Sequence, residues 1–380
     1  MGQSGGRQSE SYFLYHSIGQ YPGKARELAA AMAEFAGVWG AGDDGQWEYV
    51  LDRRQRFIDR WRGILHAAPG TVTTFENVTS GFHGLMTALP AGHLRGKTVL
   101  VGADCFPSNY FLLTGMAAAL GFTLKTVPFR QGAAHVEDED FCDAWTPDVG
   151  LALLTWVSST TSHRIALRQM VARGRQMGSL VGVDITQGAG LMPFDVAAPE
   201  VDFAVSTSLK WMCGTPGAGV LYVSPRLIPH CAPPLRGWFS QPNPFNWDIG
   251  KFAYAPDIRR FDNGTPSVVA ALASLPALDW HAGQDLSALL AHNRALSARI
   301  IDAVDDLDLP LISPRDPEKR GGSVMLRLPD RLPAAGVVAA LRGQGITTDA
   351  RGQTLRLSPG VVTTTAGVER LVEGLGRLVG

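Results

Sequence analysis

The sequence predicts an α/β protein built on a large, mostly parallel β-sheet with helices on both faces. Three observations lead to this prediction. Short apolar segments alternate along the chain with longer segments whose apolar residues recur at helical spacing. Several of the short segments are apolar throughout, which is typical of parallel strands that are buried on both faces. The chain has 380 residues, of which 45% are hydrophobic, so it is long enough for one large domain and one small one.

The alternation begins near residue 70 and continues to residue 223. The predicted strands are residues 72–75, 97–102, 123–128, 150–157, 180–184, 202–206 and 219–223. The predicted helices between them are residues 80–88, 109–120 and 165–177. Strands that alternate with helices of about 10–15 residues form βαβ units, and such units place their strands parallel in one sheet.

The C-terminal part of the chain predicts a second, smaller group of elements. Residues 225–266 are rich in aromatic residues and proline, and we predict an irregular, functional loop region there. One long helix is predicted over residues 266–301. A βαββα pattern follows, at residues 323–328, 334–344, 346–349, 354–357 and 366–378.

The composition excludes several classes of protein. The chain has 35 acidic and 34 basic residues and a net charge of -1, whereas a typical nucleic-acid binder has clustered Lys and Arg in excess. No apolar segment approaches the roughly 20 residues of a membrane span, and the first 13 residues lack the apolar core of a signal peptide. The four cysteines are too scattered for a disulfide framework or a zinc site. We therefore expect a cytoplasmic protein with no metal, nucleic-acid or membrane partner.

An acidic and a basic residue follow two of the predicted strands. Asp184 ends the strand 180–184, at the sheet edge where open α/β sheets bind ligands, and burying its carboxylate costs free energy unless a positive group faces it. Lys210 follows the next strand, before a glycine-rich turn. The pair suits pyridoxal phosphate, because Lys forms a Schiff base with the aldehyde and Asp keeps the ring nitrogen protonated. From the spacing alone, a second interpretation is equally favoured, in which Asp184 is a lone strand-end residue and Lys210 is an unrelated, exposed lysine.

The segments around these two residues resemble a known family. Residues 184–190, Asp-Ile-Thr-Gln-Gly-Ala-Gly, resemble the Asp-x-x-Gln/His segment of class V, fold-type I pyridoxal-phosphate enzymes, and residues 206–219 resemble their lysine segment. Further matches follow in order at residues 17–19, 78–79, 106–109, 237–238, 263–265 and 356–359. The most similar members of the family are kynureninases, cysteine desulfurases and isopenicillin N epimerase.

The resemblance implies the fold-type I architecture. This architecture has a large domain with a mostly parallel, seven-stranded sheet and a smaller C-terminal α+β domain. For this chain it implies an N-terminal segment at residues 1–40 that contributes to the active site and the small domain, a large cofactor-binding domain at residues 41–275, and a small domain at residues 276–380. It also implies a homodimer whose active sites are shared between the subunits.

The resemblance also implies which residues bind pyridoxal phosphate. Lys210 would form the Schiff base and later carry a proton, Asp184 would pair with the pyridine nitrogen, and Gln187 would bond the ring hydroxyl. Phe106 would stack on the ring and Thr155 would lie near it. The phosphate would be bound by Val78, Thr79, Thr207, Trp238 and Thr265, with Thr265 supplied by the second subunit.

The substrate contacts that the resemblance implies are fewer. Arg356 would hold the α-carboxylate of an amino acid through two parallel hydrogen bonds, and Ser17 and Ser158 would be further substrate contacts. Two departures limit the choice of reaction. Leu209 stands where kynureninases have Tyr before the lysine, so a proton donor is missing there. The last cysteine is Cys231, so the late nucleophilic cysteine of the desulfurases is missing as well.

We therefore expect a pyridoxal-phosphate enzyme that acts on an L-α-amino acid through a quinonoid intermediate. The expected reaction is kynureninase-like or a β-elimination that breaks a C–S or C–C bond, and the aromatic-rich loop indicates a bulky substrate from secondary metabolism. An aminotransferase and an amino-acid epimerase are the alternatives, since all these reactions share the quinonoid. A pyridoxal-phosphate-binding protein without catalysis is a further alternative, which the presence of Lys210 disfavours.

Overall fold

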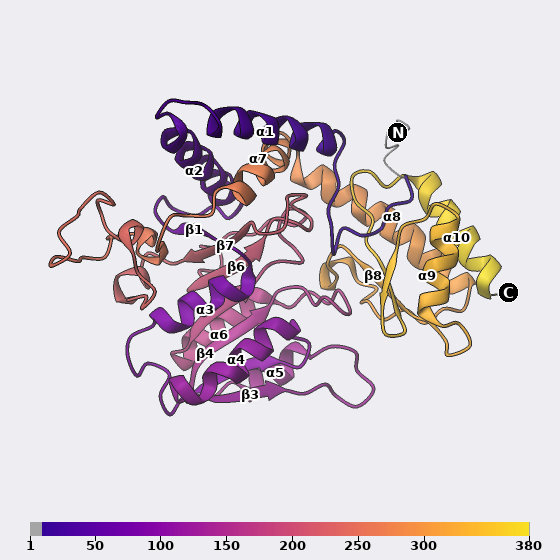
Figure 1. Cartoon of the computed structure of the whole chain (residues 1–380). Helices are drawn as coiled ribbons and strands as arrows, with labels where there is room; N and C mark the ends of the chain where they lie inside the picture. Colours follow the sequence, from indigo (N-terminus) through magenta and orange to yellow (C-terminus); the bar gives the residue numbers. More distant parts are fainter. Residues whose placement is uncertain (1–9, 380) are drawn as a thin grey trace.

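The computed structural model describes residues 10–379 of the chain. Residues 1–9 of the predicted N-terminal segment, and Gly380, lie outside the described part. Figure 1 shows a large body that contains the main sheet and, beside it, a smaller group of elements from the C-terminal part of the chain. Among residues 10–379, no helix combines the length and apolar character that a membrane crossing requires.

Seven strands form the large sheet, in the order β1-β7-β6-β5-β4-β2-β3. They are β1 (Val72–Phe75), β2 (Thr98–Gly102), β3 (Thr123–Val127), β4 (Val149–Thr155), β5 (Leu180–Asp184), β6 (Phe203–Thr207) and β7 (Gly219–Val223). β7 is antiparallel to β1 and β6, whereas the other neighbouring strands are parallel. The prediction of a mostly parallel, seven-stranded sheet is confirmed.

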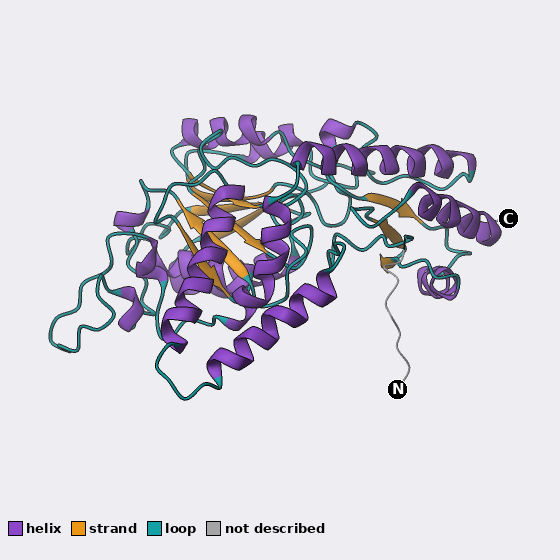
Figure 2. Cartoon of the chain, turned by 90° about the horizontal axis from the view of Figure 1, so that it is seen from above, coloured by secondary structure: helices purple, strands orange, loops and turns teal. Residues whose placement is uncertain are grey.

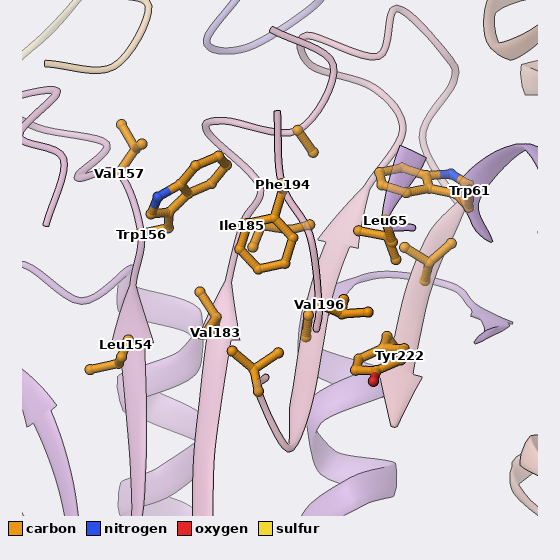
Figure 3. Close-up of a cluster of buried hydrophobic side chains, with 14 of the residues drawn as sticks. Trp61, Leu65, Leu154, Trp156, Val157, Val183, Ile185, Phe194, Val196 and Tyr222 are labelled. Atoms are coloured by element: carbon orange, nitrogen blue, oxygen red, sulfur yellow. The ribbon is translucent and has the colours of Figure 1, made fainter. Parts of the chain in front are cut away.

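The strands distribute their side chains between two hydrophobic clusters. In β2, Val99 and Val101 belong to one cluster and Leu100 to the other. In β4, Leu153 and Leu154 alternate in the same way. Successive side chains of a strand point to opposite faces, so the central strands of this sheet, such as β2 and β4, are buried on both sides. Figure 3 shows part of the cluster to which Leu154 belongs.

Helices lie on both sides of this sheet (Figure 2). Those that follow its strands are α3 (Val78–Ala88), α4 (Pro107–Leu120), α5 (Asp138–Ala144) and α6 (Leu167–Met177). A further group consists of α1 (Lys24–Trp39), α2 (Gln46–Ile64) and α7 (Val269–Ala282), and both α1 and α2 pack against α7. The sequence prediction lacked α1, α2 and α5. Since α1 buries none of its side chains and α2 buries Arg54 among apolar residues, neither presents a simple apolar face in the sequence.

The C-terminal elements form a separate three-stranded antiparallel sheet with three helices. The sheet order is β8-β10-β9. The elements are α8 (Leu286–Asp306), β8 (Val324–Arg327), α9 (Ala334–Gly343), β9 (Asp349–Arg351), β10 (Thr354–Leu357) and α10 (Thr365–Val379). Their buried apolar residues make a third hydrophobic cluster, distinct from the two of the large sheet. The division into parts at residues 40 and 275 stays a prediction.

Two predicted elements are wrong in their extent. The single helix expected over residues 266–301 is two helices, because the chain turns at Gly283 and Asp285 then caps α8 by accepting a hydrogen bond from the backbone N–H of Ser287. The strand expected at residues 346–349 begins only at Asp349. The residues before it pair instead with the N-terminal segment, where Thr347 forms a bridge with Tyr12.

The loop region predicted at residues 225–266 is irregular, as expected. It contains three short 3-10 helices, Ile228–His230, Trp238–Ser240 and Ile258–Phe261, and a fourth, Pro317–Lys319, precedes β8.

Residues 11–19 connect the small sheet to the large one. The N–H of Phe13 donates to the carbonyl of Thr347 at 2.9 Å, and the carbonyl of Phe13 accepts from the N–H of Ser358 at 2.9 Å. A few residues later, the N–H of Gly19 donates to the carbonyl of Leu209 at 2.9 Å. The N-terminal segment is therefore held between β10 and the residues that follow β6.

Candidate active site

A cavity of about 320 Å³ lies at the carboxyl ends of three parallel strands. Thr155, Asp184 and Thr207 are the last residues of β4, β5 and β6, and all three line the cavity. The parallel register places Thr155 beside Asp184. Ligands of open α/β sheets bind at this edge, so the topology alone brings these three side chains to one site.

Most residues that the sequence predicts for the cofactor line this cavity. Besides the three strand ends, the predicted residues in its lining are Val78, Thr79, Phe106, Gln187 and Lys210. They come from the start of α3, the residue before α4 and the turns after β5 and β6. Segments far apart in the sequence therefore meet at one place.

Trp238 and Thr265 are the two predicted cofactor residues that the structure does not bring to the cavity. Thr265 is exposed and lines a different cavity, of about 400 Å³, together with Ser80 and His83 of α3. Trp238 lies in an aromatic group, with its ring centroid 4.5 Å from that of Phe239. A contact of Thr265 with a second subunit's cofactor stays a prediction.

The three predicted substrate residues lie outside the cavity lining. Arg356 is buried on β10 and pairs with Asp349. Its positive charge nevertheless helps to lower the pKa of the Lys210 amine. Ser158 is buried and its hydroxyl lies 3.0 Å from that of Thr160. Ser17 is partly buried and lies in the turn that follows Leu14, which forms a β-bridge with Ser358.

Asp184 is buried and held by two hydrogen bonds. Its Oδ2 accepts from the Nδ2 of Asn109 at 2.9 Å, and its Oδ1 accepts from the backbone N–H of Thr186 at 3.0 Å. Asn109 is fully buried on the first turn of α4. A carboxylate oxygen can accept more than one hydrogen bond, so each oxygen keeps capacity for a ligand.

Lys210 is the positive group that faces Asp184. Burial lowers the pKa of the Lys210 amine to about 8, although the attraction of Asp184 acts in the opposite direction. Its Nζ lies 5.3 Å from the centroid of the Phe106 ring. A pKa near 8 means that a sizeable fraction of the amine is neutral at physiological pH, which is the form that attacks a carbonyl.

The start of α3 provides a site for an anion. Asn77 caps this helix by accepting from the N–H of Ser80 at 2.9 Å. The N–H groups of Val78 and Thr79 lie in the first turn of the helix, where backbone N–H groups have no acceptor within the helix. Both residues line the cavity. Free N–H groups at a helix N-terminus favour a phosphate.

Several residues in or beside the site were not predicted from the sequence. Thr186 lines the cavity, and its buried hydroxyl has no partner within the described part of the chain. Asn109 holds Asp184, and its presence in the matched segment 106–109 was the only signal for it. Asp349 contacts Arg356 because of the strand register, and His16 contacts Asp349 through the N-terminal segment; the sequence has no signal for either contact.

The residues present fit pyridoxal phosphate. The cavity combines an amine on Lys210 that is partly neutral at physiological pH, a buried carboxylate on Asp184 with free acceptor capacity, and N–H groups at the start of α3 that have no backbone partner within residues 10–379. The buried hydroxyl of Thr186 adds a polar atom that still needs a partner. The amine of Lys210 suits the aldehyde, the carboxylate of Asp184 suits the pyridine nitrogen, and the N–H groups of α3 suit the phosphate. The fold and the site are therefore those of a pyridoxal-phosphate enzyme.

Comparison with known proteins assigns the family. Residues 61–371 match the family description Aminotransferase class-V. A kynureninase of Deinococcus radiodurans is 32% identical over 277 residues, which cover 71% of this chain and 64% of that protein. A kynureninase of Pseudomonas fluorescens is 26% identical over 353 residues, covering 90% of this chain and 82% of that protein. The chain therefore belongs to the class-V aminotransferase family.

A solved structure agrees in fold. The cystine C-S lyase C-DES, in complex with its reaction product cysteine persulfide, superposes with a TM-score of 0.86 and 20% identity, covering 97% of each chain. A mutant of C-DES has been solved with glycine covalently linked to its pyridoxal-phosphate cofactor. The fold-type I prediction is confirmed, and the chain is a pyridoxal-phosphate-dependent enzyme related to kynureninases.

The lowered pKa of Lys210 predicts how this amine reacts in the protein stripped of cofactor. Half-maximal acylation of Lys210 by a lysine-specific reagent is expected near pH 8, whereas an ordinary lysine requires a pH near about 10.4. Short labelling at a series of pH values, followed by peptide mass spectrometry, measures this midpoint. Asp184→Asn should lower the midpoint further, because the carboxylate raises the pKa of Lys210. A wild-type midpoint near pH 10 would contradict the burial of the amine.

Proposed function

We propose that the protein is a lyase that acts on an L-α-amino acid and breaks a bond at its β-carbon, in a kynureninase-like reaction or a C–S β-elimination. One observation carries the proposal: the amine of Lys210, with a pKa lowered to about 8, shares a cavity with the buried Asp184. The kinship with kynureninases and the fold shared with a C-S lyase support this choice of reaction.

Each residue of the cavity then has a defined task. Pyridoxal phosphate, when bound, supplies an electron-accepting ring that stabilises negative charge on the α-carbon of the substrate. Asp184 would hold the proton on the ring nitrogen, and the start of α3 would bind the phosphate. Lys210 would hold the cofactor covalently, as a Schiff base, in the resting enzyme. During turnover its Nζ would take the proton from the α-carbon, a transfer that is most efficient when the pKa lies near the working pH.

Leu209 supports elimination over hydrolysis of a carbon–carbon bond. Its side chain lines the cavity directly before Lys210, and it can neither donate nor accept a proton. Thr186 and Ser159 bring hydroxyl groups to the same cavity. The apolar side chains of Phe106, Val157 and Leu209 would limit the access of water to the reacting atoms.

The test is a product analysis with the purified holoenzyme. L-Kynurenine, L-cystine and S-substituted L-cysteines are incubated with the enzyme, with and without added keto acid. We expect at least one of them to release pyruvate, or L-alanine for a hydrolytic cleavage, without a keto acid acceptor, and we expect Lys210→Ala to release neither. Turnover that requires a keto acid would identify an aminotransferase. Solvent exchange of the α-proton without a cleaved product would identify an epimerase, and either result would contradict the proposal.

We further propose a cytoplasmic homodimer with shared active sites. Thr265 is exposed and lies outside the cavity of its own subunit, which supports its use by a neighbour. All four cysteines are free thiols, in keeping with a reducing compartment. Sedimentation analysis of the holoenzyme tests the dimer. A monomer that retains full activity would contradict shared sites.

A further inference from the structure

A buried network joins the N-terminal segment to the predicted substrate-binding arginine. We infer that Asp349 and His16 are positioning residues that orient the guanidinium of Arg356 for the substrate α-carboxylate. The inference rests on the proposed function and on the role that the family resemblance implies for Arg356, which is to bind the α-carboxylate of the amino-acid substrate. It adds that His16 of the N-terminal segment takes part in substrate recognition, through Asp349.

The β-ladder explains why Asp349 meets Arg356. The two residues are direct partners in the antiparallel pair of β9 and β10. Side chains directly opposite each other in such a pair lie on the same face of the sheet. Leu355 and Leu357, the neighbours of Arg356, belong to the hydrophobic cluster on the other face. Arg356 and Asp349 therefore both lie on the face that points away from this cluster.

Asp349 holds the guanidinium along one edge. The Nε of Arg356 donates to Oδ1 of Asp349 at 2.9 Å, and Nη2 donates to Oδ2. Within residues 10–379, Nη1 of Arg356 has no hydrogen-bond partner. A two-point contact fixes the plane of the guanidinium, because its donors have a rigid geometry. The opposite edge, with Nη1, stays available for a second carboxylate.

His16 in turn holds Asp349. Its Nε2 lies 2.9 Å from Oδ1 of Asp349, and its Nδ1 lies 2.6 Å from the hydroxyl of Ser358. The side chain of His16 is 1% exposed. Hydrogen bonds from His16 and Arg356 lower the pKa of Asp349 to about 2, although burial alone acts to raise it. Asp349 is therefore ionised at neutral pH and can only accept hydrogen bonds.

The ionised Asp349 determines the tautomer of His16. Burial lowers the pKa of His16, so the ring is neutral at neutral pH and has one donor nitrogen. Nε2 must donate to Asp349, and Nδ1 therefore accepts from the hydroxyl of Ser358. That hydroxyl in turn accepts from Ser323 at 2.6 Å. Every member of the chain of hydrogen bonds has one orientation, which is what a positioning network requires.

The same histidine contacts the cofactor side of the cavity. The backbone carbonyl of His16 accepts from Nε2 of Gln187 at 3.1 Å, and Gln187 lines the cavity. His16 thus connects Arg356, through Asp349, to Gln187, the residue predicted to bond the ring hydroxyl of the cofactor. Asp349 could instead act as a competitor that occupies Arg356 until the substrate displaces it. The two roles predict opposite effects when Asp349 loses its charge.

The experiment compares L-alanine with L-alaninamide as probes, because they differ only in the carboxylate. Dissociation constants are obtained from absorbance titrations of the holoenzyme, and their ratio measures the preference for a carboxylate. We expect Asp349→Asn to reduce this preference by about 10-fold or more, the range for a lost hydrogen bond to a charged group. His16→Gln should reduce it as well. The double variant should lose less than the sum of the two single losses, since both act through Arg356.

A matched control isolates the effect. Asp305 forms a similar two-point pair with Arg315, at 2.6 and 2.8 Å, on the exposed surface of α8. Asp305→Asn should leave the carboxylate preference and the cofactor affinity unchanged. The cofactor affinity of Asp349→Asn should also stay within about threefold of wild type. If Asp349→Asn fails to fold, His16→Gln decides the question by the same ratio.

The outcomes separate this inference from the proposed function. An unchanged or increased carboxylate preference in Asp349→Asn and His16→Gln overturns the positioning role. Arg356→Lys is then the reference. If it too keeps the wild-type preference, or if the wild type does not distinguish the two probes, the role of Arg356 in binding the substrate carboxylate fails. A loss in Arg356→Lys alone leaves the proposed function intact and removes only Asp349 and His16 from recognition.

Discussion

Replacing Lys210 by alanine is expected to remove the covalent attachment of the cofactor and to lower turnover by about 10³-fold or more. The loss is large because Lys210 has two tasks, the covalent bond to the cofactor and the transfer of the α-proton, and a positioned proton carrier alone contributes about 10²–10⁴-fold. Cysteine, serine and threonine side chains elsewhere cannot replace the amine. The measurement is the absorbance of the protein before and after dialysis, together with the rate of product release.

The control for this experiment is Lys97→Ala. Lys97 is exposed and precedes β2, at the amino edge of the sheet, opposite the cavity. We expect this variant to keep the absorbance band and the rate of the wild type. Retention of a dialysis-resistant band in Lys210→Ala would contradict the assignment of Lys210.

Replacing Asp262 by alanine is expected to lower the free energy of unfolding by about 3–5 kcal/mol, the cost of leaving a buried charge without its partner. The partner is Arg54 of α2, and the side chains are only 10% and 5% exposed for Arg54 and Asp262. Nη2 of Arg54 donates to Oδ1 of Asp262 at 2.8 Å, and the hydroxyl of Thr73 donates to the same oxygen at 2.6 Å. Arg54 lies on α2, Thr73 on β1 and Asp262 in the segment that leads to Thr265, so these hydrogen bonds connect the three parts of the chain.

Two further variants test this explanation of stability. Asp305→Ala removes the surface pair with Arg315, where the carboxylate side chain is 46% exposed, and should cost only about 0–1 kcal/mol. The double variant Arg54→Met, Asp262→Leu should lose less stability than Asp262→Ala, because no buried charge remains. Urea unfolding followed by fluorescence gives all three values. Equal losses for Asp262→Ala and Asp305→Ala would show that the buried pair has no special role.

The sequence predicted the sheet and the centre of the site because both depend on local signals. The central strands of the large sheet are apolar segments, and the parallel topology places Asp184 and Lys210 at the same edge without further information. Chain turns were harder to predict. The break between α7 and α8 depends on one capping contact of Asp285, which a continuous helical pattern hides.

The contacts around Arg356 could not be predicted for a different reason. Asp349 meets Arg356 because the register of β9 and β10 pairs the two residues, and a shift of one residue would turn the side chain of Asp349 to the other face. His16 reaches Asp349 across the whole length of the chain, through a segment that has no regular structure. Contacts of this kind depend on tertiary packing, which leaves no periodic signal in the sequence.

The most direct test of the central claim is to locate the covalent link between the cofactor and the chain. The purified protein is incubated with pyridoxal phosphate, reduced with borohydride and digested, and the peptides are mapped by mass spectrometry. We predict a yellow protein that loses its visible band on reduction and carries the reduced cofactor on Lys210. A colourless protein that takes up no cofactor, or a label spread over exposed lysines with Lys210 unmodified, would contradict the account.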